Sequence, residues 1–332
     1  MSKVNWGILS TAKIGREKVI PALQKASNCR VQAIASRNES RASEVASELD
    51  IPEHFGSYEA LLNCDTVDAI YIPLPNHLHV DWSIRCLKAG KHVLCEKPIG
   101  MNAWEAEKLR NTAKKFPDLK IMEGFMYRHH PQWQHAKKLV DENVIGSLQT
   151  IHTMFTYYKD DPDNIRNKPE MGGGGMMDIG CYAISVARFL FDREPRRLTA
   201  SVRYDPTFEI DRLTSAILDF GQGTATFTCS TQASHQQSVE IYGTDALLEI
   251  EIPFNPPWNA PTHIYQHTNE GTEDISFDPC NQFTIQGEKF AQAILEDEPV
   301  PTPLSDAVAN MKAIDAVFES GEKNKWIDLN ID

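Results

Sequence analysis

Residues 6–23 read WGILSTAKIGREKVIPAL, and this stretch decides how the first third of the chain folds. An apolar run ends at Leu9, small residues follow, and a helical pattern begins near Gly15. A dinucleotide-binding turn normally carries glycines at three positions, for the tight bend, for close approach of the pyrophosphate and for helix–strand packing. Here Ser10 and Ala12 occupy the first two positions. They are the next smallest residues, and they can replace glycine if the bend avoids positive φ.

The same turn supplies candidate cofactor contacts. A hydroxyl of Ser10 or Thr11 can donate to a phosphate, and the first N–H groups of the helix point towards the same place. We therefore assign the turn to cofactor binding; an ordinary strand–helix turn is the alternative. The residues assigned are Ser10, Thr11, Ala12, Lys13 and Ile14.

The end of the second apolar run discriminates between NAD and NADP. NAD enzymes carry a carboxylate there for the ribose 2′-hydroxyl, whereas an arginine accommodates a 2′-phosphate. The sequence has Ser36 and Arg37 at this point, with Arg41 one helical turn later. Because a guanidinium fork suits phosphate oxygens, the pattern predicts NADP rather than NAD. The alternative is a pair of solvated arginines at a helix start.

Short apolar runs alternate with helical patterns through the first third of the chain, which predicts a parallel doubly wound sheet of the α/β class. Pro21 is an awkward residue in the first helix, because proline lacks a backbone N–H. Strands are expected at 4–10, 31–35, 69–72, 92–95 and 119–122, and helices at 16–26, 41–49, 80–89 and 104–116.

The rhythm changes after about residue 125. Long alternating segments then predict antiparallel strands that are half buried on one face. We expect an N-terminal Rossmann domain at 1–125 and an α+β domain at 126–332 with a large, mostly antiparallel open sheet. The strand-like segments are 148–158 and 198–252, the helical patterns are 176–191, 283–295 and 305–318, and the Pro-rich segment 253–261 is expected to be a loop.

Composition narrows the function classes. The 332 residues carry a formal net charge of −13, which argues against nucleic acid and anionic membranes as partners. No apolar run reaches the roughly 18 residues of a membrane span, and the N-terminus lacks the apolar core of a signal peptide. The seven cysteines form no Cys-x-x-Cys pair, and no histidine cluster has zinc spacing. We therefore expect reduced thiols, no metal and a cytoplasmic location.

Polar residues follow the third and fourth expected strands, at the carboxyl ends where ligands of open parallel sheets bind. Lys97 directly after a buried strand is costly unless it is paired or functional. We assign residues of both loops to the cofactor, with His79 as a further functional candidate. The cofactor assignments are Pro73, Leu74, Asn76, His77, Glu96 and Lys97.

Four consecutive glycines, Gly172–Gly175, form a flexible or closely packed loop that leads into a helical pattern. Asp178 and Tyr182 are spaced i, i+4, so they share one face of that helix. An acid and a phenol beside a glycine-rich loop form a plausible catalytic pair. The alternative is a solvated N-terminal aspartate and a packed tyrosine.

Several motifs together resemble the glucose–fructose oxidoreductase, inositol dehydrogenase and rhizopine-catabolism (Gfo/Idh/MocA) family of NAD(P)-dependent oxidoreductases over essentially the whole chain. The motifs are Pro75-Asn76 with His79, Glu96-Lys97-Pro98, Phe125-Met126-Tyr127-Arg128, and the glycine-rich loop with Asp178, Gly180 and Tyr182. Many members have histidine where this chain has Tyr182. This tyrosine, with Ser10, Ala12 and Ser36-Arg37, is similar to the subgroup of dimeric dihydrodiol dehydrogenase and NADP-dependent D-xylose dehydrogenase. The resemblance implies that the degenerate turn still binds cofactor, and it adds Arg128 to the expected cofactor contacts.

The resemblance also implies hydride transfer between a carbinol carbon and the nicotinamide. Tyr182 is the first candidate for the base, and Lys97 would supply the charge that favours its phenolate. Asp178 would hold a substrate hydroxyl or orient Lys97, and His79 would position groups or relay a proton. The expected substrate is a pyranose aldose such as D-xylose or D-glucose. A trans-dihydrodiol, or a role as a non-catalytic NADP-binding sensor, are the alternatives.

The second domain is expected to bind the substrate and to form a homodimer. Neither face of the expected sheet is purely polar, and an exposed apolar patch commonly marks a contact surface. The resemblance also implies that the open sheets pack face to face between subunits. Within the expected strands at 198–252, Ala216, Leu218 and Phe220 alternate with Ser215, Ile217 and Asp219. Candidate residues for the substrate pocket are Phe155, Tyr157, Tyr158, Asn164 and Arg166.

Overall fold

The chain divides into two compact units in the computed structural model, which describes residues 2–329. The first unit comprises Met1–Met126 with Asn281–Val308, and the second comprises Tyr127–Cys280 with Ala309–Asp332. The chain first passes from one unit to the other between Met126 and Tyr127, one residue after the division expected at residue 125. In the structure the segment 281–308 packs with the first unit, whereas the sequence analysis assigned it to the second domain.

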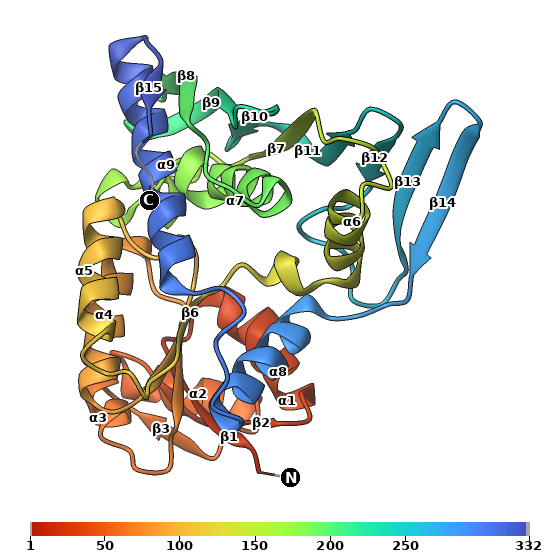
Figure 1. The fold of residues 1–332 in the computed structure, drawn as a ribbon. Helices are drawn as coiled ribbons and strands as arrows, with labels where there is room; N and C mark the ends of the chain where they lie inside the picture. Colours follow the sequence, from red (N-terminus) through yellow and green to blue (C-terminus); the bar gives the residue numbers. More distant parts are fainter. Residues whose placement is uncertain (1, 330–332) are drawn as a thin grey trace. The chain divides into compact units, whose positions relative to one another are not determined.

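The first unit contains a six-stranded, all-parallel sheet, which confirms the doubly wound α/β fold (Figure 1). Its order is β3-β2-β1-β4-β5-β6, so the strand order reverses between β1 and β4. The strands are β1 Val4–Leu9, β2 Cys29–Ala35, β3 Glu53–Phe55, β4 Ala69–Ile72, β5 His92–Cys95 and β6 Ile121–Glu123. The sequence missed β3 because a three-residue, incompletely buried strand carries no periodic signal.

Helices surround this sheet, and the first of them changes type beside Pro21. It begins as a π-helical turn at Gly15–Val19 and continues as an α-helix from Ile20, so the proline lies where the hydrogen-bond pattern changes. The helices are η1 Gly15–Val19, α1 Ile20–Lys25, α2 Glu39–Glu48, α3 Tyr58–Leu62, η2 Asn76–Leu78, α4 His79–Lys88, α5 Ala103–Ala113 and α8 Gln282–Leu295. The short η3 Met126–His129 begins at the last residue before the chain first passes to the second unit and continues into that unit.

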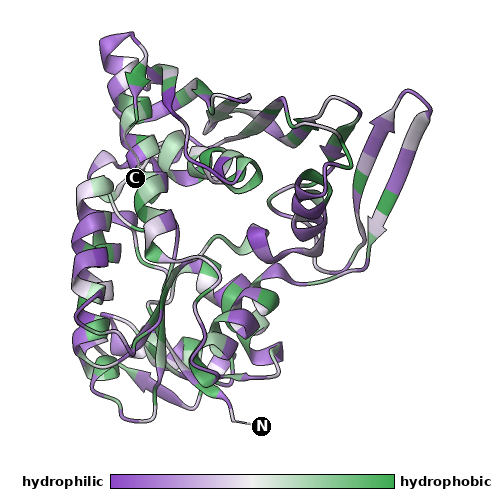
Figure 2. Cartoon of the chain, in the orientation of Figure 1, coloured by the Kyte–Doolittle hydropathy of each residue, from purple (hydrophilic) through white to green (hydrophobic). Residues whose placement is uncertain are grey.

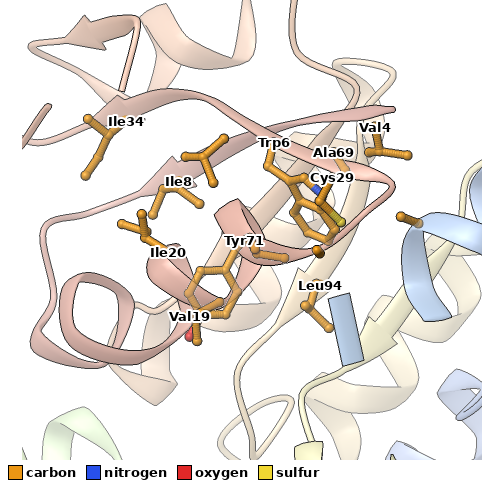
Figure 3. Close-up of a cluster of buried hydrophobic side chains, with 14 of the residues drawn as sticks. Val4, Trp6, Ile8, Val19, Ile20, Cys29, Ile34, Ala69, Tyr71 and Leu94 are labelled. Carbon is orange, nitrogen blue, oxygen red and sulfur yellow. The ribbon is translucent and has the colours of Figure 1, made fainter. Parts of the chain in front are cut away.

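The core of the first unit explains why α8 joins it. Trp6 and Tyr71 are fully buried in the cluster shown in Figure 3, and the ring of Phe290 on α8 lies 5.6 Å from that of Trp6. A Cβ on Gly287 would lie 2.4 Å from Leu23 Cδ2, so the glycine allows α8 to approach α1 closely. These contacts join residues far apart in the sequence, so no local sequence pattern predicts them.

The second unit contains a nine-stranded sheet in which only β7 and β10 pair in parallel, which confirms the mostly antiparallel sheet. Its order is β14-β13-β12-β11-β7-β10-β9-β8-β15. The strands are β7 Thr150–Tyr158, β8 Arg197–Tyr204, β9 Asp211–Asp219, β10 Thr224–Ser230, β11 Gln232–Tyr242, β12 Leu247–Ile250, β13 Thr262–Thr268, β14 Gly271–Phe277 and β15 Ile327–Asp328.

One helix of this unit is buried nearly all round. Helix α7 is coloured predominantly hydrophobic in Figure 2, and ten of its eleven residues are buried. Its neighbours in the chain include short 3₁₀ turns and a preceding π-helical turn. The helices are α6 Pro131–Asp141, η4 Ile165–Asn167, η5 Pro169–Met171, η6 Met176–Gly180, α7 Cys181–Phe191 and α9 Leu304–Lys323. Within the described residues, no helix is both long and apolar enough to cross a membrane.

The two faces of the large sheet differ in character. Ala216 and Leu218 on β9, and Phe220 just after it, are buried, so the apolar set noted in the sequence lies on the covered face. The uncovered face carries Leu213 and Ile217, which are 38% and 41% exposed. Hydroxyl groups pair across the same face, as between Ser215 Oγ and Thr228 Oγ1 at 2.8 Å and between Thr150 Oγ1 and Thr224 Oγ1 at 3.1 Å.

The glycine-rich loop before α7 is closely packed. A Cβ on Gly174, whose φ is +105°, would lie 1.9 Å from Asp211 Oδ1, and one on Gly173 would lie 2.5 Å from the Arg166 carbonyl oxygen. The Met176 N–H donates to Asp211 Oδ2 at 2.6 Å. The buried Asp211 carboxylate therefore anchors the start of the helical segment that carries Asp178 and Tyr182.

Stability should depend on pH through Asp211. Burial outweighs the hydrogen bonds to its carboxylate and raises its pKa to about 7, against an ordinary value of about 3.9. Between these values the folded chain binds a proton that the unfolded chain does not, so the free energy of unfolding falls as pH rises. Urea unfolding should show the wild type losing stability relative to Asp211→Asn between pH 5 and pH 8. A difference that stays constant with pH would contradict this account.

Candidate functional site

The turn after β1 bends at Ser10 with positive φ. Ser10 has φ of +99°, a region that non-glycine residues adopt only with strain. Its Oγ accepts from the Ala12 N–H at 3.2 Å and donates to the Pro73 carbonyl at 3.4 Å, while its own N–H donates to the Ala35 carbonyl at 2.9 Å. The bend therefore does not meet the condition under which serine replaces glycine without strain. The surrounding hydrogen bonds hold a side chain where the motif normally has glycine.

The remaining turn residues present polar and apolar groups to solvent. The Lys13 side chain is 79% exposed, Ile14 is 37% exposed, and Arg16 Nε donates to the Thr11 carbonyl at 3.0 Å. A Cβ on Gly15 would meet Pro73 Cγ at 3.6 Å, which is ordinary contact. Packing therefore tolerates a side chain at the one glycine that this turn retains, while the strained backbone lies at Ser10.

Of the two arginines that follow β2, one is exposed and the other is paired with a carboxylate. Ser36 is nearly buried, and its Oγ accepts from the Asn38 N–H at 3.2 Å. Arg37 is exposed and hydrogen-bonds the hydroxyl of Tyr58. Arg41 forms an ion pair with Glu44 on the same helix. Of the two arginines, Arg37 has its charge at the strand end with no carboxylate paired to it among the ion pairs found in the described residues.

His79 connects the loops that follow β4 and β5. Its ring is fully buried, with Nδ1 2.7 Å from the Pro98 carbonyl oxygen and Nε2 2.7 Å from that of Leu74. Burial is the dominant influence and lowers the pKa of His79 to about 4, although the two carbonyls act in the opposite direction. A buried ring engaged at both nitrogens joins the two loops, which agrees with the positioning role expected of His79.

The carboxyl end of β5 is held by hydrogen bonds to neighbouring strands. The Tyr71 hydroxyl donates to Glu96 Oε1 at 2.7 Å, and the Ile99 N–H donates to Glu123 Oε1 at 2.7 Å. Lys97 lies between these anchors and is half-buried. Together with Asn76 and His77, it belongs to loops at the carboxyl edge of the parallel sheet, where ligands of such sheets bind.

In the second unit, two donors converge on one oxygen of Asp178. The Tyr157 hydroxyl donates to Asp178 Oδ2 at 2.5 Å, and Arg166 Nε donates to the same oxygen at 2.8 Å. The sequence had only placed Tyr157 and Arg166 in an unordered list of pocket residues. The spacing of these residues offers no signal for the contact, because β7, η4 and η6 bring them together in space.

Tyr182, four residues after Asp178, lies among aromatic rings. Its ring centroid is 5.2 Å from that of Phe254, 5.8 Å from that of Tyr127 and 5.9 Å from that of Phe155. The residue is 5% exposed. The phenol is therefore surrounded by apolar rings, with the Asp178 carboxylate one helical turn away.

Arg128 belongs to the second unit and anchors α7. Its NH2 group donates to Ser185 Oγ at 2.9 Å, and the Tyr127 hydroxyl lies 2.7 Å from the same oxygen. Arg128 is 7% exposed. The guanidinium packs inside the unit that carries Asp178 and Tyr182, and its expected cofactor contact stays a prediction. Within residues 2–329, no group of three or more His, Cys, Asp or Glu side chains is placed to hold a metal ion.

Ser10 should carry measurable backbone strain. Ser10→Gly removes the strain of positive φ, worth about 1–3 kcal/mol, and loses two long hydrogen bonds. Ser10→Ala keeps the strain and loses the same bonds. We expect the glycine variant to be more stable than the alanine variant by about 1–2 kcal/mol in urea unfolding without cofactor. An alanine variant at least as stable as the glycine variant would rule out the strain.

Comparison with known proteins identifies the two units. Residues 4–125 match the oxidoreductase family with an NAD-binding Rossmann fold, and residues 133–249 match the GFO/IDH/MocA C-terminal domain. The chain is 38% identical to a D-xylose 1-dehydrogenase (NADP(+)) of Haloferax volcanii, over 98% of this chain and 99% of the relative. It is 33% identical to a trans-1,2-dihydrobenzene-1,2-diol dehydrogenase of Xenopus tropicalis, over 81% of each.

A solved relative shares the whole architecture. The 3-ketoreductase of Actinomadura kijaniata, in complex with NADP and TDP-benzene, is 31% identical with a TM-score of 0.90, covering 96% of this chain and 98% of that chain. The two family models divide the chain near the point where the parallel sheet gives way to the mostly antiparallel one. The chain belongs to the Gfo/Idh/MocA family and is an NAD(P)-dependent dehydrogenase or reductase that acts on CH–OH groups.

Proposed function

We propose that this enzyme transfers hydride between NADP and a pyranose aldose such as D-xylose or D-glucose. The observation that carries the proposal is the Asp178 carboxylate, held by Tyr157 and Arg166 one helical turn before a buried Tyr182. This arrangement offers a fixed acceptor for a substrate hydroxyl beside a group that can exchange a proton.

The first unit fits a dinucleotide. The strained bend at Ser10 supports this, because residues with strained backbones cluster at ligand-binding and active sites. When bound, the cofactor would supply the hydride chemistry. Ser10, Thr11, Ala12, Lys13 and Ile14 would hold the pyrophosphate, and Ser36 and Arg37 would hold the 2′-phosphate. The loops bearing Pro73, Leu74, Asn76, His77, Glu96 and Lys97 would orient the nicotinamide half.

The proton is assigned to Tyr182 rather than to Asp178. Two donors on one Asp178 oxygen, one of them a guanidinium, stabilise the ionised carboxylate and make it a poor base. Asp178 is therefore the acceptor that orients a substrate hydroxyl. Tyr182 exchanges the proton of the reacting hydroxyl, and Lys97 donates a hydrogen bond to the reacting oxygen. Solved variants of the related 3-ketoreductase replace a tyrosine and a lysine, which are the residue types chosen here.

The relatives support a sugar over other alcohols. The D-xylose dehydrogenase covers nearly the whole chain at higher identity than the dihydrodiol dehydrogenase does. A trans-dihydrodiol dehydrogenase is the second candidate, favoured by the aromatic rings around Tyr182. The seven free cysteines support a reducing, cytoplasmic location.

Loss of the proton-handling groups should abolish turnover and spare cofactor binding. Tyr182→Phe and Lys97→Met should each lower kcat by at least about 10²-fold with the preferred aldose. Both variants should still change NADPH fluorescence on binding. If Tyr182→Phe kept a near-normal kcat across pH, a residue other than Tyr182 would have to exchange the proton. Cofactor binding by the wild type without turnover on a broad panel of aldoses and diols would favour the sensor alternative.

Arg37 should set the preference for NADP. Arg37→Ala removes one charge-assisted phosphate contact, which should weaken NADP(H) binding by about 1.5–3 kcal/mol and leave NAD(H) binding nearly unchanged. Arg30 is exposed near the opposite end of β2, so Arg30→Ala is the matched control and should change neither affinity. Fluorescence titration measures both. If Arg37→Ala weakened the binding of NADP(H) and NAD(H) equally, a contact with the 2′-phosphate would be excluded.

A homodimer through the uncovered face of the large sheet completes the proposal. Exposed Leu213 and Ile217 support it, because apolar groups grouped on a sheet face commonly mark a contact surface. Ile217→Asp should shift the mass measured by light scattering from two chains towards one. Leu295→Asp, at a 40% exposed position in the first unit, is the control and should leave the mass unchanged. A wild type with the mass of one chain at all concentrations would disprove the dimer.

A further inference from the structure

Arg166 binds the catalytic segment of the second unit in two ways. Its Nε donates to Asp178 Oδ2 at 2.8 Å, and its carbonyl accepts from the Gly174 N–H at 2.8 Å. The absent side chain at Gly173 allows this close approach, since a Cβ there would lie 2.5 Å from the same carbonyl. Arg166 therefore contacts both the loop before the helix and the carboxylate on its first turn.

The charge of Arg166 also acts on Tyr182. Asp178 is the largest influence that raises the pKa of Arg166, and Tyr157 and Tyr182 raise it further. Charge interactions are reciprocal. Because these tyrosines favour the charged form of Arg166, its guanidinium favours their ionised forms in turn. Asp178 alone would do the opposite, because a carboxylate one helical turn from Tyr182 disfavours a phenolate.

We propose that Arg166 is a positioning residue that neutralises Asp178 and thereby lets Tyr182 act as the base. The inference rests on the proposed function and moves the decisive charge from Lys97 to a residue of the same unit as Tyr182. Arg166 performs two separable tasks. Its charge offsets the Asp178 carboxylate, and its planar donor group fixes the orientation of that carboxylate towards the substrate hydroxyl.

The test compares Arg166→Gln with Arg166→Lys in the full chain. Arg166→Gln removes the charge, so the acidic limb of the kcat–pH profile should move to higher pH by roughly one unit. The phenolate absorbance assigned to Tyr182, by subtraction of the matching Tyr182→Phe variant, should move in the same direction. Arg166→Lys keeps the charge and loses the planar fork, so its limb should stay in place while KM for the aldose rises.

Two further variants complete the design. Arg197 forms a comparable pair on β8, with Nε 2.9 Å from Asp219 Oδ2, so Arg197→Gln should leave the profile unchanged. Arg166→Gln combined with Asp178→Asn removes both charges and should return the phenolate absorbance towards the wild-type midpoint. If the midpoint of the Tyr182 phenolate absorbance did not move in Arg166→Gln while Tyr182→Phe was inactive, the role of Arg166 would be overturned and the proposed function would stand. Normal turnover by Tyr182→Phe would instead overturn the proposed function.

Discussion

The second unit depends on the fit between a run of glycines and the side chains beneath it. A Cβ on Gly174 would lie 1.9 Å from the Asp211 carboxylate, and that carboxylate accepts from the Met176 N–H at 2.6 Å. The start of the helical segment is therefore tied to β9 by a buried carboxyl group. Asp178 and Tyr182 follow within that segment, so their positions are set by the contact below them.

The first unit shows the opposite use of small residues. The turn after β1 keeps a glycine at position 15, where packing leaves room for a side chain, and has Ser10 where the backbone needs positive φ. The serine hydroxyl bonds both the turn and the following strand end, which compensates part of the strain. A motif read by counting glycines therefore misses where the conformational demand lies.

Local patterns were enough for the regular elements of this chain. The apolar runs at β1, β4 and β5 and the change of rhythm after residue 125 indicated a parallel sheet followed by an antiparallel one, and both are present. Short elements such as β3 escaped, because three residues show no period. The placement of α8 escaped as well, because it depends on Phe290 meeting Trp6 across most of the chain length.

The sequence by itself determined the fold class, the family and the chemical types available, since these follow from periodicity and from motifs that are contiguous along the chain. It named Asp178 and Tyr182 through their helical spacing. Only the tertiary structure decided the contacts of the candidate residues: Tyr157 and Arg166 on one oxygen of Asp178, and His79 buried between two carbonyls in the first unit. Such contacts join residues from different elements, and their energies depend on distance and burial in space, which the order of residues along the chain does not encode locally.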